Sequence, residues 1–231
     1  KIYYTKDSKI QILDKKINIF AKNNSKVMFT GGVMENVKID YKNEGSLSKD
    51  NFSNLNGCIN FYDIELRKIK INISNTSCED SINLVRARGE IDEIISNNSI
   101  SDGIDFDFSN LKIKEILVKN SKNDCLDFSF GNYIIENVEA YNCGDKAFSI
   151  GENSNVKINR AFSMGSNINI AIKDKSNVLI NNMESKKTNY CVAMYRKKSE
   201  FIGSTFNVLK ENCENKYNLI DPGNLFNNNV F

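Results

Sequence analysis

The chain has 231 residues, and its 31 lysines and arginines nearly balance 29 aspartates and glutamates, so a net charge of +2 does not indicate a nucleic-acid or anionic-membrane surface. It contains no histidine and no Cys-x-x-Cys, which excludes imidazole-based acid–base chemistry and argues against a zinc site. No segment is apolar enough to span a bilayer. The first residue is Lys1 rather than methionine, which is compatible with a leader having been removed.

The first part of the chain predicts short strands followed by a polar interruption. Alternating apolar residues mark these strands at Ile17, Ile19, Val27, Phe29, Val37 and Ile39. Residues 43–56 are almost entirely polar, and we expect them to form a loop that protrudes from an early coil.

A repeat of 22 residues governs the middle of the chain, from about residue 56 to residue 205. Two apolar columns keep this step, one formed by Ile82, Ile104, Leu126, Phe148, Ile170 and Val192, the other by Leu84, Phe106, Phe128, Ile150, Ile172 and Met194. One residue separates the columns, so both lie on one face of a strand, and the constant step stacks them from coil to coil. The sequence therefore predicts an all-β chain that forms a right-handed parallel β-helix with coils of about 22 residues.

Each repeat contains two further strand signals and a turn residue on the same step. The second signal includes Leu111, Ile113, Tyr133, Ile135, Val156, Ile158, Val178 and Ile180, and the third includes Ile116, Val138, Ala161 and Met183. The step from Tyr133 to Val156 is 23, which predicts one extra residue in the turn at Glu152 to Ser154. A column of Asn98, Asn120 and Asn142 predicts a ladder of amides at a left-handed turn.

The chain length suits a single domain over residues 1–231, with about nine or ten coils and a rod about 45 to 50 Å long at about 4.8 Å per coil. Beyond Phe206 the repeat fades, and we expect residues 207–231 to cap the last coil. Cys125 and Cys191 lie three coils apart and are too distant to pair. The pairs Cys58 with Cys78, Cys125 with Cys143, and Cys191 with Cys213 are possible, although the sequence does not determine the connectivity.

The groups best suited to chemistry are acidic. The candidate catalytic residues are Asp102, Asp105, Asp124 and Asp127. If Ile104 and Phe106 face the core, Asp105 and Asp127 point outward from the same sheet, one coil apart, and repulsion raises one pKa. Such a pair suits the acid and nucleophile of a retaining glycosidase, a Ca²⁺ ion, or simple turn amides. We expect no resident cofactor or metal, with Ca²⁺ at Asp105 and Asp127 as the alternative.

Two further columns are expected to face outward. One is Ser81, Gly103, Cys125, Ala147, Asn169 and Cys191, and the other is Asn83, Asp105, Asp127, Ser149, Ala171 and Ala193. Because nearly all are small, we expect a flat or slightly concave face that suits an extended polysaccharide or a packed partner. The candidate substrate-binding residues at its later coils, suited to an acidic sugar or a solvated rim, are Lys146, Lys173, Tyr190, Tyr195, Arg196 and Lys197.

Several stretches carry a family resemblance: Asp80 to Leu84, Ser101 to Ser109, Asn123 to Ser129, Gly144 to Ser154, Ile172 to Ser176, and Tyr195 to Phe201. They resemble right-handed parallel β-helix repeat proteins of the pectin-lyase-like superfamily. The likeness covers about residues 78 to 205 and is greatest to β-helix modules of bacterial surface proteins beside spore-coat-kinase-like or lamin-tail-like domains. It implies the fold, and no established activity for the module.

A weaker resemblance is to polygalacturonases, which share this architecture. Asp102, Asp124 and Lys173 match positions of their motifs, whereas the second aspartate of a pair, the histidine and the arginine are missing. Lyases and epimerases on this fold use a base and a cation, for which Lys146, Lys173 and Tyr195 are available.

The sequence thus supports three hypotheses about function. The first is a non-catalytic glycan-binding or scaffold module of a bacterial envelope or surface protein, located in the envelope or outside the cell, with a polysaccharide or a neighbouring domain as partner. The second is a polysaccharide-active enzyme, a glycoside hydrolase before a lyase or epimerase. The third is a structural spacer or self-assembling rod.

Overall fold

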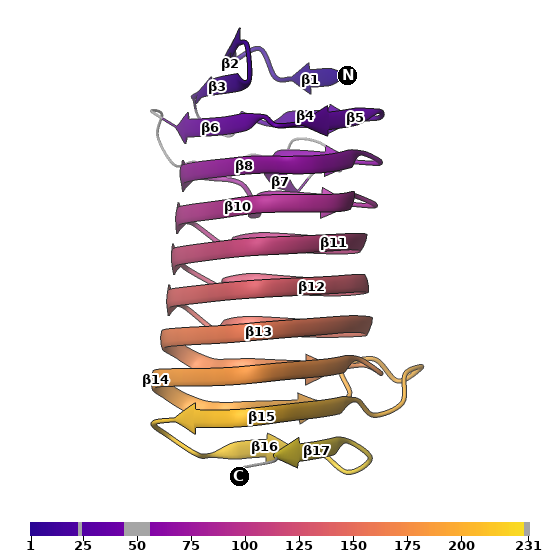
Figure 1. Ribbon diagram of the computed structural model, residues 1–231. Coiled ribbons are helices and arrows are strands. Elements are labelled where there is room, and N and C mark those ends of the chain that lie inside the picture. Colours follow the sequence, from indigo (N-terminus) through magenta and orange to yellow (C-terminus); the bar gives the residue numbers. More distant parts are fainter. Residues whose placement is uncertain (23–24, 44–55, 229–231) are drawn as a thin grey trace.

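The chain forms a parallel β-solenoid of about nine turns, with its two ends at opposite ends of the rod (Figure 1). This computed structural model describes residues 1–22, 25–43 and 56–228. The predicted all-β parallel β-helix with coils of about 22 residues is confirmed. The loop predicted at residues 43–56 lies almost entirely outside the described residues.

Seventeen strands make up one continuous sheet in the described part of the chain. The early strands are β1 (Ile2–Tyr4), β2 (Ser8–Leu13), β3 (Lys16–Ala21), β4 (Val27–Thr30), β5 (Val33–Glu35), β6 (Lys38–Asn43), β7 (Gly57–Tyr62), β8 (Glu65–Thr76) and β9 (Asp80–Val85). The later strands are β10 (Arg88–Ser99), β11 (Asp102–Ser121), β12 (Leu126–Cys143), β13 (Lys146–Lys173), β14 (Asn177–Tyr195), β15 (Thr205–Cys213), β16 (Asn218–Ile220) and β17 (Leu225–Asn228).

The register of the coils follows the apolar columns of the sequence. Ile104 pairs with Leu126, Leu126 pairs with Phe148, and later Ile170 pairs with Val192, all in parallel strands. These side chains are fully buried, and the rings of Phe106 and Phe128 stack with their centroids 4.7 Å apart. The predicted core columns are therefore confirmed.

The two ends of the rod differ. At the N-terminal end, β1 pairs with β4 and β2 pairs with β3, both antiparallel. At the C-terminal end, β16 and β17 stay parallel to β14 and β15, so residues 207–228 continue the stacking of the coils.

The turns carry the predicted polar ladder. Asn98, Asn120 and Asn142 have φ of 60°, 58° and 53°, in the left-handed region that asparagine tolerates. Their amides form hydrogen bonds from coil to coil, with Asn120 donating to Asn98 at 3.0 Å and Asn142 donating to Asn120 at 2.9 Å. The extra residue predicted near Glu152 is also present, as a register shift between β12 and β13.

One of the two columns predicted to face outward lies inside. Ser81, Cys125 and Asn169 are 0% exposed, and the Ser81 hydroxyl contacts the hydroxyls of Thr76 and Ser99 across the interior. The whole column that was expected outside is buried: Ser81, Gly103, Cys125, Ala147, Asn169 and Cys191. The prediction was wrong because strict alternation fails at the corner where the chain enters each strand, so two consecutive residues, such as Ser81 and Ile82, both point inward.

Three disulfides close this corner from inside. They join Cys58 to Cys78, Cys125 to Cys143, and Cys191 to Cys213, and leave no free cysteine in the described residues. These are the three pairs that the sequence left possible.

No helix in the described ranges is long and apolar enough to cross a membrane.

Candidate functional site

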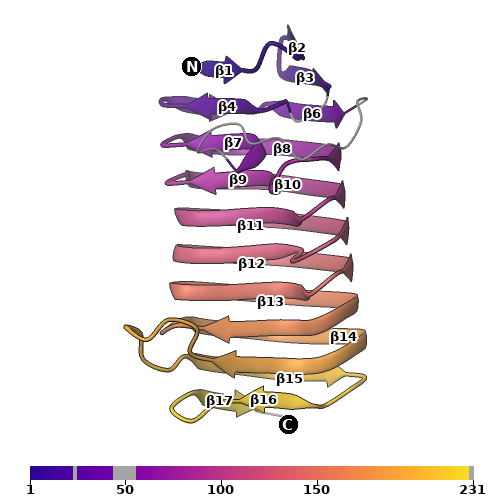
Figure 2. The same ribbon diagram turned by 180° about the vertical axis from the view of Figure 1, so that it is seen from behind.

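Six aspartates gather on the outer side of the strand at the start of each of three successive coils. We call this surface the aspartate face; it consists of Asp80, Asp102, Asp105, Asp107, Asp124 and Asp127, from β9, β11 and the entrance to β12. Its strands lie on the side that Figure 2 brings forward, where β9 is labelled. Because Ile104 and Phe106 point into the core, the intervening Asp105 faces away from it.

A polar row runs along the centre of this face. Asn83, Asp105, Asp127 and Ser149 occupy equivalent positions in four successive coils and pair directly in parallel register. The coil repeat thus sets an amide, two carboxyls and a hydroxyl side by side at the spacing of neighbouring strands, about 4.8 Å. This column was predicted to face outward, and the structure places its polar members there.

Asp105 and Asp107 form the tightest part of the cluster. The Nδ2 atom of Asn83 donates to Oδ2 of both, at 3.0 Å and 3.1 Å, and the two carboxyls are hydrogen-bonded to each other. Burial, reinforced by the charges of Asp80, Asp107 and Asp127, raises the pKa of Asp105 to about 10. Burial also raises the pKa of Asp107, while its hydrogen bonds with Asn83 and Asp105 oppose the rise. Asp105 therefore keeps its proton at neutral pH and donates it to Asp107.

Two carboxylate oxygens of the aspartate face are buried without a hydrogen-bond partner. They are Oδ2 of Asp80, whose residue is 3% exposed, and Oδ1 of Asp127. Burial, followed by the charge of Asp102, raises the pKa of Asp80 to about 8. An unpaired buried polar atom is costly, so both oxygens are open to a hydrogen-bonding partner that the described chain does not supply.

Asp102 and Asp124, two of the four candidate catalytic residues, instead cap turns. Oδ1 of Asp102 accepts from the backbone N–H of Asp124 at 2.8 Å and from the amide of Asn123 at 2.7 Å. Oδ1 of Asp124 accepts from the backbone N–H of Lys146 at 3.0 Å. Burial raises the pKa of Asp102 to about 6, although the hydrogen bonds from the backbone of Asp124 and from Asn123 lower it. Burial also raises the pKa of Asp124, although the positive charge of Lys146 lowers it. These hydrogen bonds are ordinary turn chemistry, and a catalytic role for Asp102 and Asp124 stays a prediction.

Asp80 and Asp107 were not among the predicted site residues, although both belong to this cluster. The signal for Asp107 was present in the sequence: it lies two residues after Asp105 and so shares its side of the strand. Asp80 was harder to find, because it lies at the corner where alternation fails and its coil contributes Asn83 in place of an aspartate to the row.

The predicted cations are mostly occupied by the chain itself. Nζ of Lys146 lies 3.3 Å from Asp124 and also bonds Asp145; burial tends to lower the pKa of Lys146, but these two carboxylates raise it overall. Lys173 is 6% exposed, crosses the bare backbone of Gly151 and donates to Oγ of Ser149 at 2.7 Å. The sequence predicted that both ammonium groups bind an acidic sugar, whereas the structure pairs both with groups of the chain itself.

The other predicted binding residues lie around the last regular coils. Tyr190 and Tyr195 are half-buried and pack against Ile168, Ala171 and Ala193, which close the polar row at its C-terminal end. Arg196 and Lys197 are exposed at the start of a loop, residues 196–204, that protrudes between β14 and β15 in Figure 2.

The loop is fastened to the rod at several points. Asp174 accepts from the backbone N–H groups of Lys197 and Lys198, at 2.8 Å and 2.9 Å. Lys198 also pairs with Glu152 at 2.6 Å, and Phe201 meets Phe130 edge to face. The structure thus brings the predicted tyrosines and the loop to one end of the face, and the aspartates to the other.

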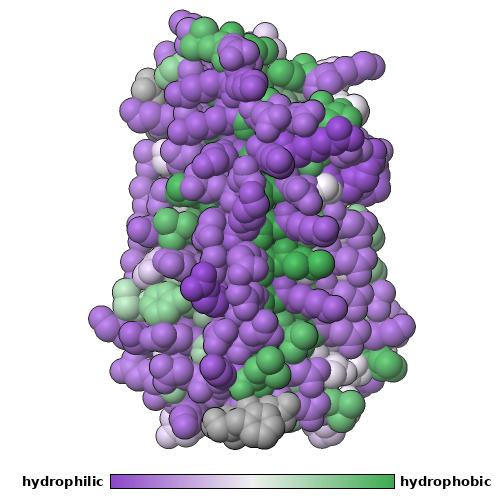
Figure 3. Space-filling view, in the orientation of Figure 1, coloured by the Kyte–Doolittle hydropathy of each residue, from purple (hydrophilic) through white to green (hydrophobic). Residues whose placement is uncertain are grey.

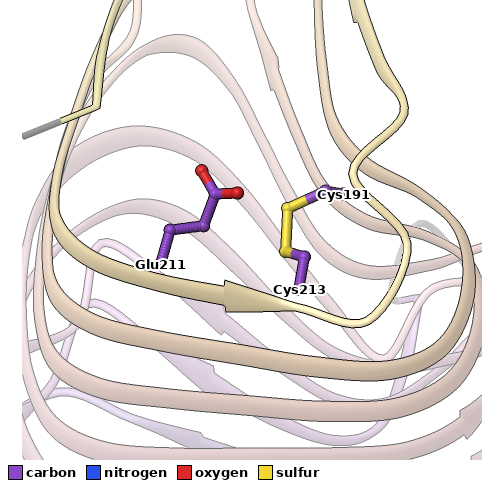
Figure 4. A group of neighbouring side chains, drawn as sticks. All are labelled: Cys191, Glu211 and Cys213. Carbon is purple, nitrogen blue, oxygen red and sulfur yellow. A yellow bond between two sulfur atoms is a disulfide. The ribbon is translucent and has the colours of Figure 1, made fainter. Parts of the chain in front are cut away.

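One group of side chains in the described residues meets the distance criterion for holding a metal: Cys191, Glu211 and Cys213. Figure 4 shows that the two sulfurs are joined in a disulfide, so neither is available as a thiolate. In the described residues, no three carboxylates of the aspartate face bring their oxygens within 4.8 Å of one another, and Ca²⁺ at Asp105 and Asp127 stays a prediction.

The opposite side of the rod carries a furrow, which we name the front furrow. Its walls are two outward columns that include Glu115, Asn137, Arg160 and Phe162, and the buried Val138 and Met183 lie at its floor, enclosing about 720 Å³. Hydrophobic surface runs down the middle of this side between hydrophilic columns (Figure 3). Its polar groups pair with one another, for example Asn137 with Glu115 at 2.6 Å.

Comparison of the chain with protein families, curated proteins and solved structures finds no match.

Proposed function

We propose that the chain is a glycan-binding β-solenoid module of a bacterial envelope or surface protein, and that it holds a sugar chain along the aspartate face. The observation that carries the proposal is the polar row of Asn83, Asp105, Asp127 and Ser149. The unpartnered Oδ1 of Asp127 can accept from a sugar hydroxyl, while Asn83 and Ser149 are buried and bonded to Asp105, Asp107 and Lys173 and hold the two ends of the row in place. The resemblance to the pectin-lyase-like superfamily supports the same proposal at the level of fold.

The charge of the face argues against an acidic sugar. Six carboxyls lie together, while Lys146 is paired with Asp124 and Asp145, and Lys173 is buried against Ser149. A uronic acid or sulfated sugar would meet like charge there. We therefore expect a neutral or basic polysaccharide.

The three disulfides support an envelope or extracellular location. Disulfides persist in oxidising compartments and are rare in the bacterial cytoplasm. A module of this kind would present its faces to polysaccharide outside the cytoplasmic membrane.

The test is a screen of the purified protein against acidic, neutral and basic polysaccharides, with binding and the release of reducing or unsaturated ends followed together. We expect Asp127→Asn to weaken binding by about tenfold, because one good charge-assisted hydrogen bond is worth roughly that factor. The matched control is Asp92→Asn, which changes a carboxylate that pairs with Lys114 at the surface and should leave binding unchanged. Binding that is lost equally in both variants would contradict the assignment of the face.

A second candidate function is glycoside hydrolysis. It is favoured by one observation: Asp105 holds a proton next to Asp127, whose Oδ1 has no partner. Retaining glycosidases need a protonated acid and a free carboxylate separated by about 5 to 5.5 Å, which is near the strand spacing that separates these two residues. In this case Asp105 would act as the acid and Asp127 as the nucleophile.

The same screen distinguishes the candidates. Release of reducing ends that Asp127→Asn abolishes, with binding retained, would establish hydrolysis. Binding without any cleavage supports the module, and the absence of both would leave a structural spacer.

A further inference from the structure

We infer that the aspartate face selects sugar chains that carry free amino groups, because two buried carboxyl oxygens there lack a partner and the described part of the chain directs no free cation to them. The inference rests on the proposed function and names its ligand. Asp80 is 3% exposed, and its Oδ2 has no partner.

The surroundings of Asp80 and of Asp105, which pairs with Asp127, are strongly acidic. The charges that act on Asp80 come from Asp102, Glu79, Asp107 and Asp127, and those that act on Asp105 come from Asp80, Asp107 and Asp127. Among the described residues, no cation is one of the main charges that shift the pKa of Asp80 or Asp105. An ammonium group would satisfy the bare oxygens and offset the repulsion, and hydrogen bonds of this charged kind are about twice as strong as neutral ones.

The nearest lysines of the described chain do not supply this ammonium. Lys146 bonds Asp124 and Asp145, at the far edge of the face from Asp80. Lys173 ends at Ser149, one coil beyond Asp127. Within the described ranges, therefore, neither of these lysines supplies a cation to the oxygens, and a ligand can supply one.

A sugar fits the row better than a basic peptide does. Asn83 and Ser149 continue the row on either side, but both are buried and already bonded within the chain, so the part of the row left to a ligand is Asp105 and Asp127. The strands that carry the row are paired on both edges, β11 with β9 and β12, so a peptide backbone would find no sheet edge to join.

Binding should also release protons. Asp80 and Asp105 hold their protons at neutral pH in the free protein, and a cation beside them favours the ionised form. A neutral sugar brings no such charge. Proton release is therefore a signature of the amino group itself.

The experiment compares three hexasaccharides with the same β-1,4 backbone, composed of glucosamine, N-acetylglucosamine or glucose, by titration calorimetry at about pH 6, where the amine is largely charged. We expect the glucosamine hexamer to bind at least about tenfold more tightly than the other two, and to release protons when buffers of different ionisation enthalpy are compared. Asp127→Asn should reduce this preference, and Asp92→Asn should preserve it. Matching thermal unfolding curves of the variants would show that each is folded.

Equal affinity for the three hexamers would overturn the inference and leave the proposed function standing. Binding of none of them, in a protein that is folded, would overturn both. Hexalysine serves as the peptide arm, and tighter binding of hexalysine than of the glucosamine hexamer would show that the face recognises a basic peptide, against the inference.

Discussion

The two broad sides of the rod use the same repeat in opposite ways. On the front, equivalent positions of successive coils carry groups that satisfy each other, such as Lys114 with Asp92 at 2.5 Å and Asn137 with Glu115 at 2.6 Å. On the aspartate face, equivalent positions carry like groups: Asp102 pairs with Asp80, and Asp105 with Asp127. The first arrangement needs nothing else, whereas the second leaves repulsion and two bare oxygens.

Because of this difference, the stability of the fold explains the residues of the front but not the stacked acids of the aspartate face. A repeat places any residue type next to its own copy, so a stacked row of one acid costs stability unless its charge is removed or bound. The aspartate face carries such a row and is less stable for it, whereas the front places opposite or complementary groups next to each other. Stability measurements on the two sides test the distinction directly.

The largest expected effect lies in the core beneath the aspartate face. Phe128→Ala removes a ring that stacks on Phe106 and should lower the free energy of unfolding by about 3 to 5 kcal/mol. Val138→Ala, beneath the front furrow, removes fewer atoms and should cost less. Urea denaturation measures both, and an equal or larger loss in Val138→Ala would show that the two sides do not rest on comparable packing.

The next effect depends on pH and is specific to the aspartate face. The pKa of Asp105 is about 10 and that of Asp80 about 8 in the folded protein, above the usual 3.8. Their contribution to stability is therefore complete below about pH 4 and is lost as pH rises toward 8 and 10. Asp105→Asn should raise the free energy of unfolding by about 2 to 3 kcal/mol at about pH 8 and leave it unchanged near pH 4.

The front side provides the control for this pH effect. Asp92→Asn removes an exposed carboxylate that pairs with Lys114, and its unfolding midpoint should stay close to that of the unchanged protein at both pH values. A gain in Asp92→Asn at high pH as large as that in Asp105→Asn would mean that overall charge, and not the stacked row, sets the pH dependence.

The smallest effect concerns the asparagine ladder, which shows a column that suits its own copies. Asn120→Ala places a side chain with a Cβ and no amide at φ of 58°, and should cost about 1 to 2 kcal/mol. Asn120→Gly removes the same amide but tolerates this φ, so thermal unfolding should show a smaller loss. If both variants lose the same amount, the bonds to Asn98 and Asn142 matter more than the backbone angle.

The sequence was sufficient for the fold wherever a single strand period held. Ile104, Leu126 and Phe148 keep the step of 22, and the structure pairs them directly. Asn98 and Asn142 likewise predicted the ladder, because the conformation of a turn depends on the residues in the turn itself. Cysteine pairing stayed open at that stage, since three pairs at similar spacing do not fix which sulfurs meet.

The site was harder to predict from the sequence than the fold, because it depends on the bends where the chain enters each strand and on the direction that long side chains take. Ser81 turns inward and Asp80 outward at a bend that the alternation rule does not describe. Lys173 was expected to face a sugar, but Gly151 leaves room for its chain to lie back toward Ser149. Asp102 and Asp124 look like Asp105 in the sequence, and only their backbone partners separate them.

The three internal disulfides have a mechanical consequence. They lie about three coils apart, and they join residues separated by 20, 18 and 22 positions, so each locks about one turn of the solenoid into a closed ring. If the two ends of the rod were pulled apart, the coils between the disulfides would peel away one by one, while each locked ring would withhold its own length of chain from extension. A reducing agent would release those lengths and make the rod both longer and weaker under tension.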